Sequence, residues 1–379
     1  MSTGDAGSLT PTLDRVSRDV RAILARVLDG AEVTVPDAET LAVTTGRDLH
    51  ALTLVADELR QRHVGDTVTF VVNRNINFTN VCIKHCGFCA FSRDHREEEG
   101  YLLPIEEVVR RAREASDLGA SEVCIQAGLP IKEYLTELKE AGLGTLPGTS
   151  AEILDQPIRD QIARGRITVD QWVEVITTAH ALGIRTTSTI MYGHVETPAH
   201  WVRHMNLLRA IQKDTGGFTE FVPLSLIHSE APMYSKALVP GVRPGATGFE
   251  VIRMHALARV MLGPVLRNIQ ASWVKEGPKF SQVLLDAGAN DLGGTLINES
   301  ISTSAGAQYG QLVGPAELVR WIRDAGRVPA QRDTLYNVMR TYEAGDDPTT
   351  ELDTIDDAET RFGSYRRLIA SGEFRFTQR

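Results

Sequence analysis

Three of the four cysteines in this 379-residue sequence, Cys82, Cys86 and Cys89, lie within eight residues in the spacing C-x3-C-x2-C. An odd number of cysteines so close together cannot pair among themselves, and the chain is otherwise poor in cysteine. A metal site is therefore favoured over a disulfide framework. Which metal it holds depends on the fourth ligand.

Two kinds of metal centre fit these cysteines. Structural zinc is almost always held by four protein ligands, so His85 or His95 would have to complete a Cys3His site. Iron–sulfur electron carriers use four cysteines, but Cys124 lies in the apolar run Val-Cys-Ile, which favours a small buried side chain over a ligand. Three cysteines alone suggest a cubane cluster with one iron open to a substrate or cofactor. The cysteines themselves leave both alternatives open.

Composition narrows the class of protein. The formal charge is −9, with 49 acidic and 40 basic residues, which argues against a nucleic-acid-binding surface. No run approaches the length of a membrane-spanning helix, and the first residues lack the basic-then-apolar pattern of a signal peptide. We expect a cytoplasmic protein that binds neither nucleic acid nor membrane, a compartment that suits reduced thiols.

The rest of the chain predicts an α/β barrel that positions the cysteines. Apolar residues at helical spacing predict an N-terminal helical extension over residues 1–65. Residues 66–312 then alternate strands with amphipathic helices, as in a (β/α) TIM-like barrel, in which chemistry occupies the loops after the strands. Residues 313–379 predict a C-terminal section of helices, including 315–325 and 332–341, and a solvated acidic tail. The expected strands fall within 67–74, 121–128, 144–150, 185–193, 219–227, 267–273 and 289–295, one fewer than the eight of a complete barrel.

The aromatic Phe88 before the last cysteine makes the cysteine pattern more specific. The run C-x3-C-x-aromatic-C resembles the cluster loop of the radical S-adenosylmethionine (SAM) superfamily. This resemblance implies that Cys82, Cys86 and Cys89 hold a [4Fe–4S] cluster whose open iron binds SAM. It also implies a 5′-deoxyadenosyl radical, formed with a low-potential electron donor.

Five separated segments carry a closer resemblance, over roughly residues 60–340. They resemble the second subunits of FO synthase, a family of 5-amino-6-(D-ribitylamino)uracil–L-tyrosine 4-hydroxyphenyl transferases in deazaflavin coenzyme biosynthesis. The resemblance implies removal of hydrogen from L-tyrosine, transfer of its hydroxybenzyl group to the ribitylaminouracil, and release of an imine of glycine. FO synthase subunit 1 is the implied pathway partner. The segments are NRNINFTNVCIKHCGFCAFSR, GTLPGTSAEIL, TSTIMYGHVE, PLSLIHSEAPMY and GANDLGGTLINESIS.

The SAM site implied by the resemblance includes residues from several strand ends. Gln126 and Gly128 end the strand after the cluster loop and would hold the amino end of SAM, although a plain strand-to-helix turn also explains the glycine. Glu152 is a candidate for the SAM ribose or amino group, or simply a first-turn glutamate favoured by the helix dipole. Met191 could line the adenine site or pack in the core.

Candidate substrate residues also follow strands. His228 and Glu230 could bind polar groups of the substrate, or the histidine could be hydrogen-bonded locally. Trp273 is expected at another strand end. Asn290 and Asp291 suit hydrogen bonds to the ribityl chain or the uracil, although Asn-Asp beside two glycines also forms turns. No catalytic residue can be assigned from the sequence.

One departure from the family concerns the barrel wall. Family members carry a further helix and strand of roughly 35 residues, about one βα unit, where this sequence runs from Pro130 directly into Ile131. This agrees with the count of seven strands and predicts a barrel one strand short. The alternatives are a radical SAM enzyme of the futalosine route to menaquinone, or a degenerate or zinc-stabilised barrel without catalysis.

Overall fold

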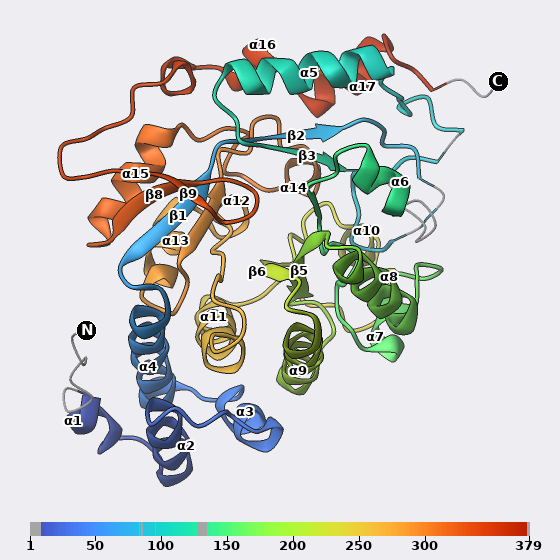
Figure 1. Cartoon of the computed structure of the whole chain (residues 1–379). Coiled ribbons are helices and arrows are strands. Elements are labelled where there is room, and N and C mark those ends of the chain that lie inside the picture. Colours follow the sequence, from blue (N-terminus) through green and yellow to red (C-terminus); the bar gives the residue numbers. More distant parts are fainter. Residues whose placement is uncertain (1–8, 83, 85, 95, 127–134, 377–379) are drawn as a thin grey trace.

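The structure, a computed structural model, describes residues 9–376 except 83, 85, 95 and 127–134 (Figure 1). Its first helices form the expected N-terminal extension, and the buried apolar residues of α2 recur at helical spacing, including Val20, Ile23, Leu24 and Val27. The long α4 packs against α11 (Gly248–Leu262), which joins the extension to the barrel. The extension contains α1 (Thr10–Leu13), α2 (Arg18–Leu28), α3 (Val35–Leu41) and α4 (Gly46–Val64).

The barrel wall contains every strand position expected from the sequence. The first strand bends at Val72, so that β1 pairs with β7 while β2 pairs with β3. At the position of the expected sixth strand there are only two isolated β-bridges among the described residues. Ile269 pairs with β6 and Gln270 pairs with β7, so these two residues connect the two strands. All these pairings are parallel. The strands are β1 (Thr67–Val71), β2 (Asn73–Asn77), β3 (Glu122–Gln126), β4 (Thr145–Leu146), β5 (Arg185–Tyr192), β6 (Phe218–Ser225) and β7 (Asp291–Gly294).

Among the described residues, the strand pairings leave an opening in the wall between β3 and β4. The strands follow one another around the wall in a single order, which begins at β3 and ends at β4. This order is β3, β2, β1, β7, residues 269–270, β6, β5 and β4. Within the described part of the chain, no ladder joins β3 to β4. The opening lies where the sequence predicted a missing helix and strand.

A C-terminal hairpin differs from the sequence prediction. Residues 332–341 were expected to form a helix, but β8 (Val328–Arg332) and β9 (Val338–Thr341) form an antiparallel pair. β8 pairs in parallel with β1 along its whole length. It occupies the edge of β1 that is available because β3 pairs with β2 instead. The expected boundary at residue 312, between the barrel and the C-terminal section, stays a prediction. β8 follows this boundary in the sequence and lies in the same sheet as β1.

Helices surround the strands (Figure 1). Most follow a strand, as in repeated βα units. Among the described residues, no helix combines the length and apolar character needed to cross a membrane. The helices after β2 are α5 (Ile105–Asp117), α6 (Leu135–Glu140), α7 (Gln156–Ile162), α8 (Val169–Ala181), α9 (Pro198–Thr215), α10 (Pro232–Ser235), α11, α12 (Trp273–Glu276), α13 (Pro278–Leu285), α14 (Ile301–Ser304), α15 (Pro315–Asp324), the 3-10 helix Glu351–Thr354, α16 (Ala358–Phe362) and α17 (Tyr365–Ser371).

The C-terminal tail is packed against the barrel, and the expectation of a solvated appendage was wrong here. Tyr365 of α17 donates a hydrogen bond to the Phe91 carbonyl at 3.0 Å, and its ring lies 4.7 Å from that of Phe91. Tyr101 lies in the same buried cluster. The acidic composition predicted exposure, but the aromatic residues at its end have apolar partners. Figure 1 shows α16 and α17 beside α5 at the top of the molecule.

Candidate functional site

The three cysteines lie on the loop that follows β2. The loop is held by backbone hydrogen bonds, from Cys82 to the Arg93 carbonyl at 2.9 Å and from Cys89 to the Cys86 carbonyl at 3.1 Å. Cys86 is buried, and the other two are partly exposed. The loop therefore begins at the carboxyl end of the first barrel strand, where barrel enzymes place their chemistry.

Gly87 fixes this loop against two other parts of the barrel. Its N–H donates to the Ile162 carbonyl at 2.8 Å, and its own carbonyl accepts from the Met233 N–H at 2.6 Å. A Cβ at this position would lie 2.9 Å from the Met233 Cβ. Only glycine lets α7 and α10 approach this closely.

Arg166 connects the cysteine loop to the segment after β4. Its guanidinium lies 2.9 Å from the Glu152 carboxylate and 5.8 Å from the centre of the Phe88 ring. Burial raises the pKa of the Cys86 thiol to about 11, whereas Arg166 acts to lower it. The other two cysteines raise this pKa further, so the three thiols lie within electrostatic reach of one another.

A cubane cluster is compatible with these thiols. Among the described residues, no group of three or more His, Cys, Asp or Glu side chains converges to hold one metal ion. The cysteines of a cubane each bind a different iron, so they need not converge. Cys124 lies on β3, where burial raises its pKa to about 12, and none of the three loop cysteines is among the groups that shift it. His85 and His95 lie outside the described residues, so the structure does not test the zinc alternative.

The segment around Glu152 is strained and tightly held. Ser150 and Glu152 both have positive φ angles, 70° and 43°. The buried Arg159 donates to the carbonyls of Ser150 and Ala151 at 2.8 and 2.5 Å. Strained backbone that is held in this way is typical of functional sites.

Met191 and Gln126 occupy neighbouring strand ends. Met191, near the end of β5, donates its N–H to the Glu152 carbonyl at 2.6 Å, which brings two of the predicted SAM residues together. Gln126 ends β3, and its amide lies 3.4 Å from the Cys124 sulfur. Gly128 lies outside the described residues.

His228 and Glu230 lie in the loop after β6, directly before α10. The His228 ring packs edge-on against Tyr234 at 4.8 Å, and Glu230 is exposed. Because α10 is hydrogen-bonded to Gly87, this loop lies on the same end of the barrel as the cysteines. Their role as substrate ligands stays a prediction.

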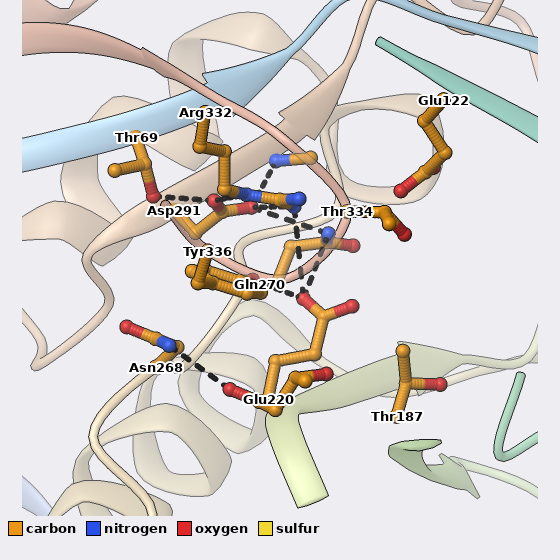
Figure 2. A network of polar contacts seen from close by, with 12 residues as sticks. Thr69, Glu122, Thr187, Glu220, Asn268, Gln270, Asp291, Arg332, Thr334 and Tyr336 are labelled. Carbon is orange, nitrogen blue, oxygen red and sulfur yellow. Dashed lines mark hydrogen bonds and ion pairs between the residues drawn. The ribbon is translucent and has the colours of Figure 1, made fainter. Parts of the chain in front are cut away.

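Asn290 and Asp291 lie at the other end of the barrel. The expectation that they close a strand was wrong, because Asp291 is the first residue of β7. Its carboxylate binds Arg332 of β8 at 2.7 and 3.2 Å and accepts from Thr69 at 2.5 Å (Figure 2). The Asn290 side chain accepts from Arg259 at 2.8 Å. These side chains have structural partners, and we leave both out of the proposed site.

Trp273 opens α12 and is 1% exposed. Its indole donates to the Gly294 carbonyl at 2.9 Å, and its ring lies 6.2 Å from that of Trp321. It anchors α12 at the carboxyl ends of the strands.

Sequence reasoning missed Arg166. This residue carries no motif of its own, because it meets the cysteine loop only through contacts between distant segments of the folded chain. No local pattern in the sequence pointed to it.

Two family models match the chain. The model of the radical SAM superfamily matches residues 76–131 and 127–208, and the model of the CofH/MqnC C-terminal region matches residues 215–345. The radical SAM match is divided at the place where the sequence predicted the missing segment.

Similar solved structures support the fold alone. The hydrogenase maturase HydG from Carboxydothermus hydrogenoformans has a TM-score of 0.68 at 16% identity, covering 87% of this chain and 85% of its own. Methylornithine synthase (PylB) has a TM-score of 0.63 at 19% identity, with 81% and 97% covered.

Curated relatives are much more similar in sequence. The 5-amino-6-(D-ribitylamino)uracil–L-tyrosine 4-hydroxyphenyl transferase of Methanothermobacter thermautotrophicus is 45% identical over 358 positions, with 96% of its length and 83% of this chain covered. Since 83% of 379 residues is about 315, about 43 of those positions have no counterpart here. FO synthase of Mycobacterium tuberculosis is 43% identical over 86% of this chain, which spans 43% of its length. The chain therefore belongs to the radical SAM superfamily and, within it, to the family of 5-amino-6-(D-ribitylamino)uracil–L-tyrosine 4-hydroxyphenyl transferases.

Proposed function

We propose that this chain joins the 4-hydroxybenzyl group of L-tyrosine to 5-amino-6-(D-ribitylamino)uracil. Membership of the radical SAM superfamily implies a [4Fe–4S] cluster and SAM. In our proposal Cys82, Cys86 and Cys89 bind three of the four irons and leave the fourth open for SAM. The cluster with bound SAM would supply a 5′-deoxyadenosyl radical, and the chain would bind, orient and shield the substrates.

One observation carries the proposal. Arg166 joins Glu152 to Phe88 and lies beside Cys86, so a carboxylate from another strand end is held next to the cysteine loop. In our proposal Glu152 and Met191 contact the SAM molecule bound to the cluster, and the hydrogen bond from the Met191 N–H to the Glu152 carbonyl supports their acting together. Phe88, Gln126, Glu152 and Met191 are the proposed SAM contacts, and His228 and Glu230 the proposed substrate contacts.

The product of the proposed reaction would be consumed by a second activity. FO synthase of Mycobacterium tuberculosis, of which this chain spans 43%, is longer than this chain, and we infer that FO synthase subunit 1 is the pathway partner that uses the product. The protein also requires a low-potential electron donor.

The test is anaerobic reconstitution with iron and sulfide, followed by incubation with SAM, dithionite, L-tyrosine and the ribitylaminouracil. We expect 5′-deoxyadenosine and the coupled product only when both substrates are present. Turnover of an enolpyruvyl-benzoate substrate instead would favour the futalosine-route alternative. Bound zinc without cluster absorbance would refute the proposal, and an intact cluster without SAM cleavage would indicate a degenerate barrel.

A further inference from the structure

The end of the chain returns to the cysteine loop. Phe374 accepts a backbone hydrogen bond from Leu102 at 2.9 Å, and Phe376 donates one to the Gly100 carbonyl at 2.8 Å. This backbone pairing involves the segment that directly follows the cysteine loop in the sequence. Residues 364–376, which we call the C-terminal strap, follow the region that the family models match.

Hydrogen bonds fix the start of the strap. The Ser364 hydroxyl accepts from the Arg367 N–H at 3.3 Å, so that α17 begins at Tyr365. Just before the strap, the Asn298 side chain donates to the Phe362 carbonyl at 3.2 Å, which ties the chain to the segment after β7. Tyr365, the first residue of α17, is therefore held on both sides.

The Tyr365 hydroxyl joins the two ends of the cysteine loop. It donates to the Phe91 carbonyl at 3.0 Å and accepts from the Asn80 side-chain amide at 3.3 Å. Asn80 lies two residues before Cys82, and Phe91 lies two residues after Cys89. One atom of the strap therefore holds the chain on either side of the three cysteines.

Asn80 is itself held firmly at the base of the loop. Its side-chain oxygen accepts from the Tyr101 N–H at 2.9 Å, and its side-chain nitrogen also donates to the Glu99 carbonyl at 3.0 Å. Its backbone carbonyl accepts from the Arg93 N–H at 2.8 Å. The hydrogen bond between Asn80 and Tyr365 therefore connects the strap to a fixed point of the loop.

The strap also packs against one of the three cysteines. Phe91, Tyr101, Leu103 and Tyr365 form a buried apolar cluster, and Cys89 packs against it. Cys89 also packs against the main core of the barrel. This thiol therefore lies between the barrel and a cluster of side chains to which the strap contributes.

Anchoring the strap does not require a hydroxyl group at residue 365. A phenylalanine would keep the ring packing and the backbone pairing. A buried hydroxyl destabilises a fold unless it is hydrogen-bonded, and both partners of this one lie at the ends of the cysteine loop. A loop whose ends are already held together loses less conformational entropy when it binds a ligand.

We propose that Tyr365 is a positioning residue for the cluster, and that the C-terminal strap holds the cysteine loop in the arrangement that binds iron. Tyr365 acts through the loop and touches neither the reacting atoms nor the substrates. With three protein ligands on a single loop, retention of the cluster depends on how firmly that loop is held. This inference rests on one part of the proposed function, that the three cysteines bind the cluster.

The first test compares anaerobically reconstituted Tyr365→Phe with the unmodified chain. The variant keeps the aromatic ring and loses both hydrogen bonds of the hydroxyl. An iron chelator should remove the visible absorbance of the cluster roughly three- to tenfold faster in the variant, the effect of losing one or two ordinary hydrogen bonds. Tyr309→Phe, at a residue that is 46% exposed, is the matched control and should lose its cluster at the unmodified rate.

A second measurement separates this role from a purely structural one. If the strap stabilises the cluster, the cluster must stabilise the strap to the same extent, because the coupling is reciprocal. Amide hydrogen exchange in α17 and at Phe376 should therefore slow when the unmodified chain is loaded with its cluster. In Tyr365→Phe the same loading should slow exchange much less.

The outcomes distinguish this inference from the proposed function. Equal rates of cluster loss in Tyr365→Phe and the unmodified chain, or exchange in the strap that does not respond to the cluster, would overturn the inference alone. A loaded enzyme that shows both effects but yields no coupled product would support the inference and overturn the proposed function. An unmodified chain that assembles no cluster would overturn both.

Discussion

Arg166 organises the candidate site through three interactions that no local pattern reveals. It binds Glu152, lies over the ring of Phe88 and lies within electrostatic reach of the Cys86 thiol. The guanidinium is planar and always charged, so it can make these contacts together, which a lysine could not. We therefore expect substitution of Arg166 to lower the cluster content more than the stability of the fold.

We predict that Arg166→Gln lowers retention of the cluster. Without the positive charge, nothing offsets the burial that raises the pKa of Cys86, and thiolate formation becomes harder. Iron and sulfide per chain after anaerobic reconstitution should fall by at least about half, since a thiol must lose its proton to bind metal. The control is Arg164→Gln, two residues away on the surface. Equal iron content in both variants would contradict this role.

The residues that sequence could identify were those with a local signal. The cysteines and Phe88 form one short run, so their spacing alone indicated the cluster loop. Asn290 and Asp291 were misplaced because a shift of a few residues in a strand boundary moves a side chain to the opposite end of the barrel. Arg166 joins the site only when distant loops meet.

At the level of secondary structure, the β8–β9 hairpin closes the amino end of the barrel. Its turn brings Tyr336 to Glu220 of β6 (Figure 2). It also brings Thr334 to Thr145 of β4, at 3.3 Å. Arg332 stacks on the Tyr336 ring at 3.9 Å. The hairpin thus contacts β4 on one side of the opening and runs along β1 on the other.

We predict that Arg332→Met destabilises the protein by about 3–5 kcal/mol, the cost of leaving a buried carboxylate unpaired. The carboxylate concerned is that of Asp291, which is fully buried. Urea unfolding measures the change. Arg340→Gln, which removes an exposed ion pair on β9, should stay within about 0.5 kcal/mol. Adding Asp291→Leu to Arg332→Met should recover part of the loss, and a further loss would contradict the pairing.

We predict that the stability of the protein depends on pH through Glu220, which contacts the hairpin at Tyr336. Burial raises its pKa from 4.5 to about 7, and Arg332 opposes this shift. Between these values the folded state keeps a proton that the unfolded state has released, so this group favours folding less as the pH rises. Relative to Glu220→Gln, the free energy of unfolding should fall by about 1–3 kcal/mol from pH 5 to pH 7.5. Urea midpoints of both proteins test this, and parallel curves would be evidence against a protonated Glu220.

The hairpin itself could not be predicted from its sequence. Its turn contains no glycine, and Tyr336 adopts a φ of 67° there, a conformation that local propensity disfavours. Contacts with Glu220 and with Arg332 compensate for it. The parallel strands were predictable, by contrast, because apolar runs between helices leave few alternatives.

At the scale of the whole molecule, the opening between β3 and β4 is the main departure from a closed barrel. About 43 aligned positions of the Methanothermobacter relative have no counterpart in this chain. Near the opening, Ile125 on β3 is 51% exposed, and α5 leaves Ile105 68% exposed. Exposed apolar residues and unpaired strand edges are both liabilities for a soluble barrel.

We predict that inserting the relative's unmatched segment between Pro130 and Ile131 stabilises the protein. A strand in the opening would pair with the free edges of β3 and β4, and its helix would cover apolar surface such as Ile125. A gain of 2 kcal/mol or more corresponds to a rise in Tm of at least about 2 °C for a chain of this size. Amide hydrogen exchange should slow along β3 and β4.

A flexible Gly/Ser segment of equal length is the control for this insertion. It lengthens the loop without supplying a strand, so it should leave the Tm unchanged or slightly lower. If both insertions had the same effect on Tm and on exchange in β3 and β4, the opening would not be a vacant strand position. In that case the hairpin contacts of Thr334 and Tyr336 would be sufficient to hold the two sides of the wall together.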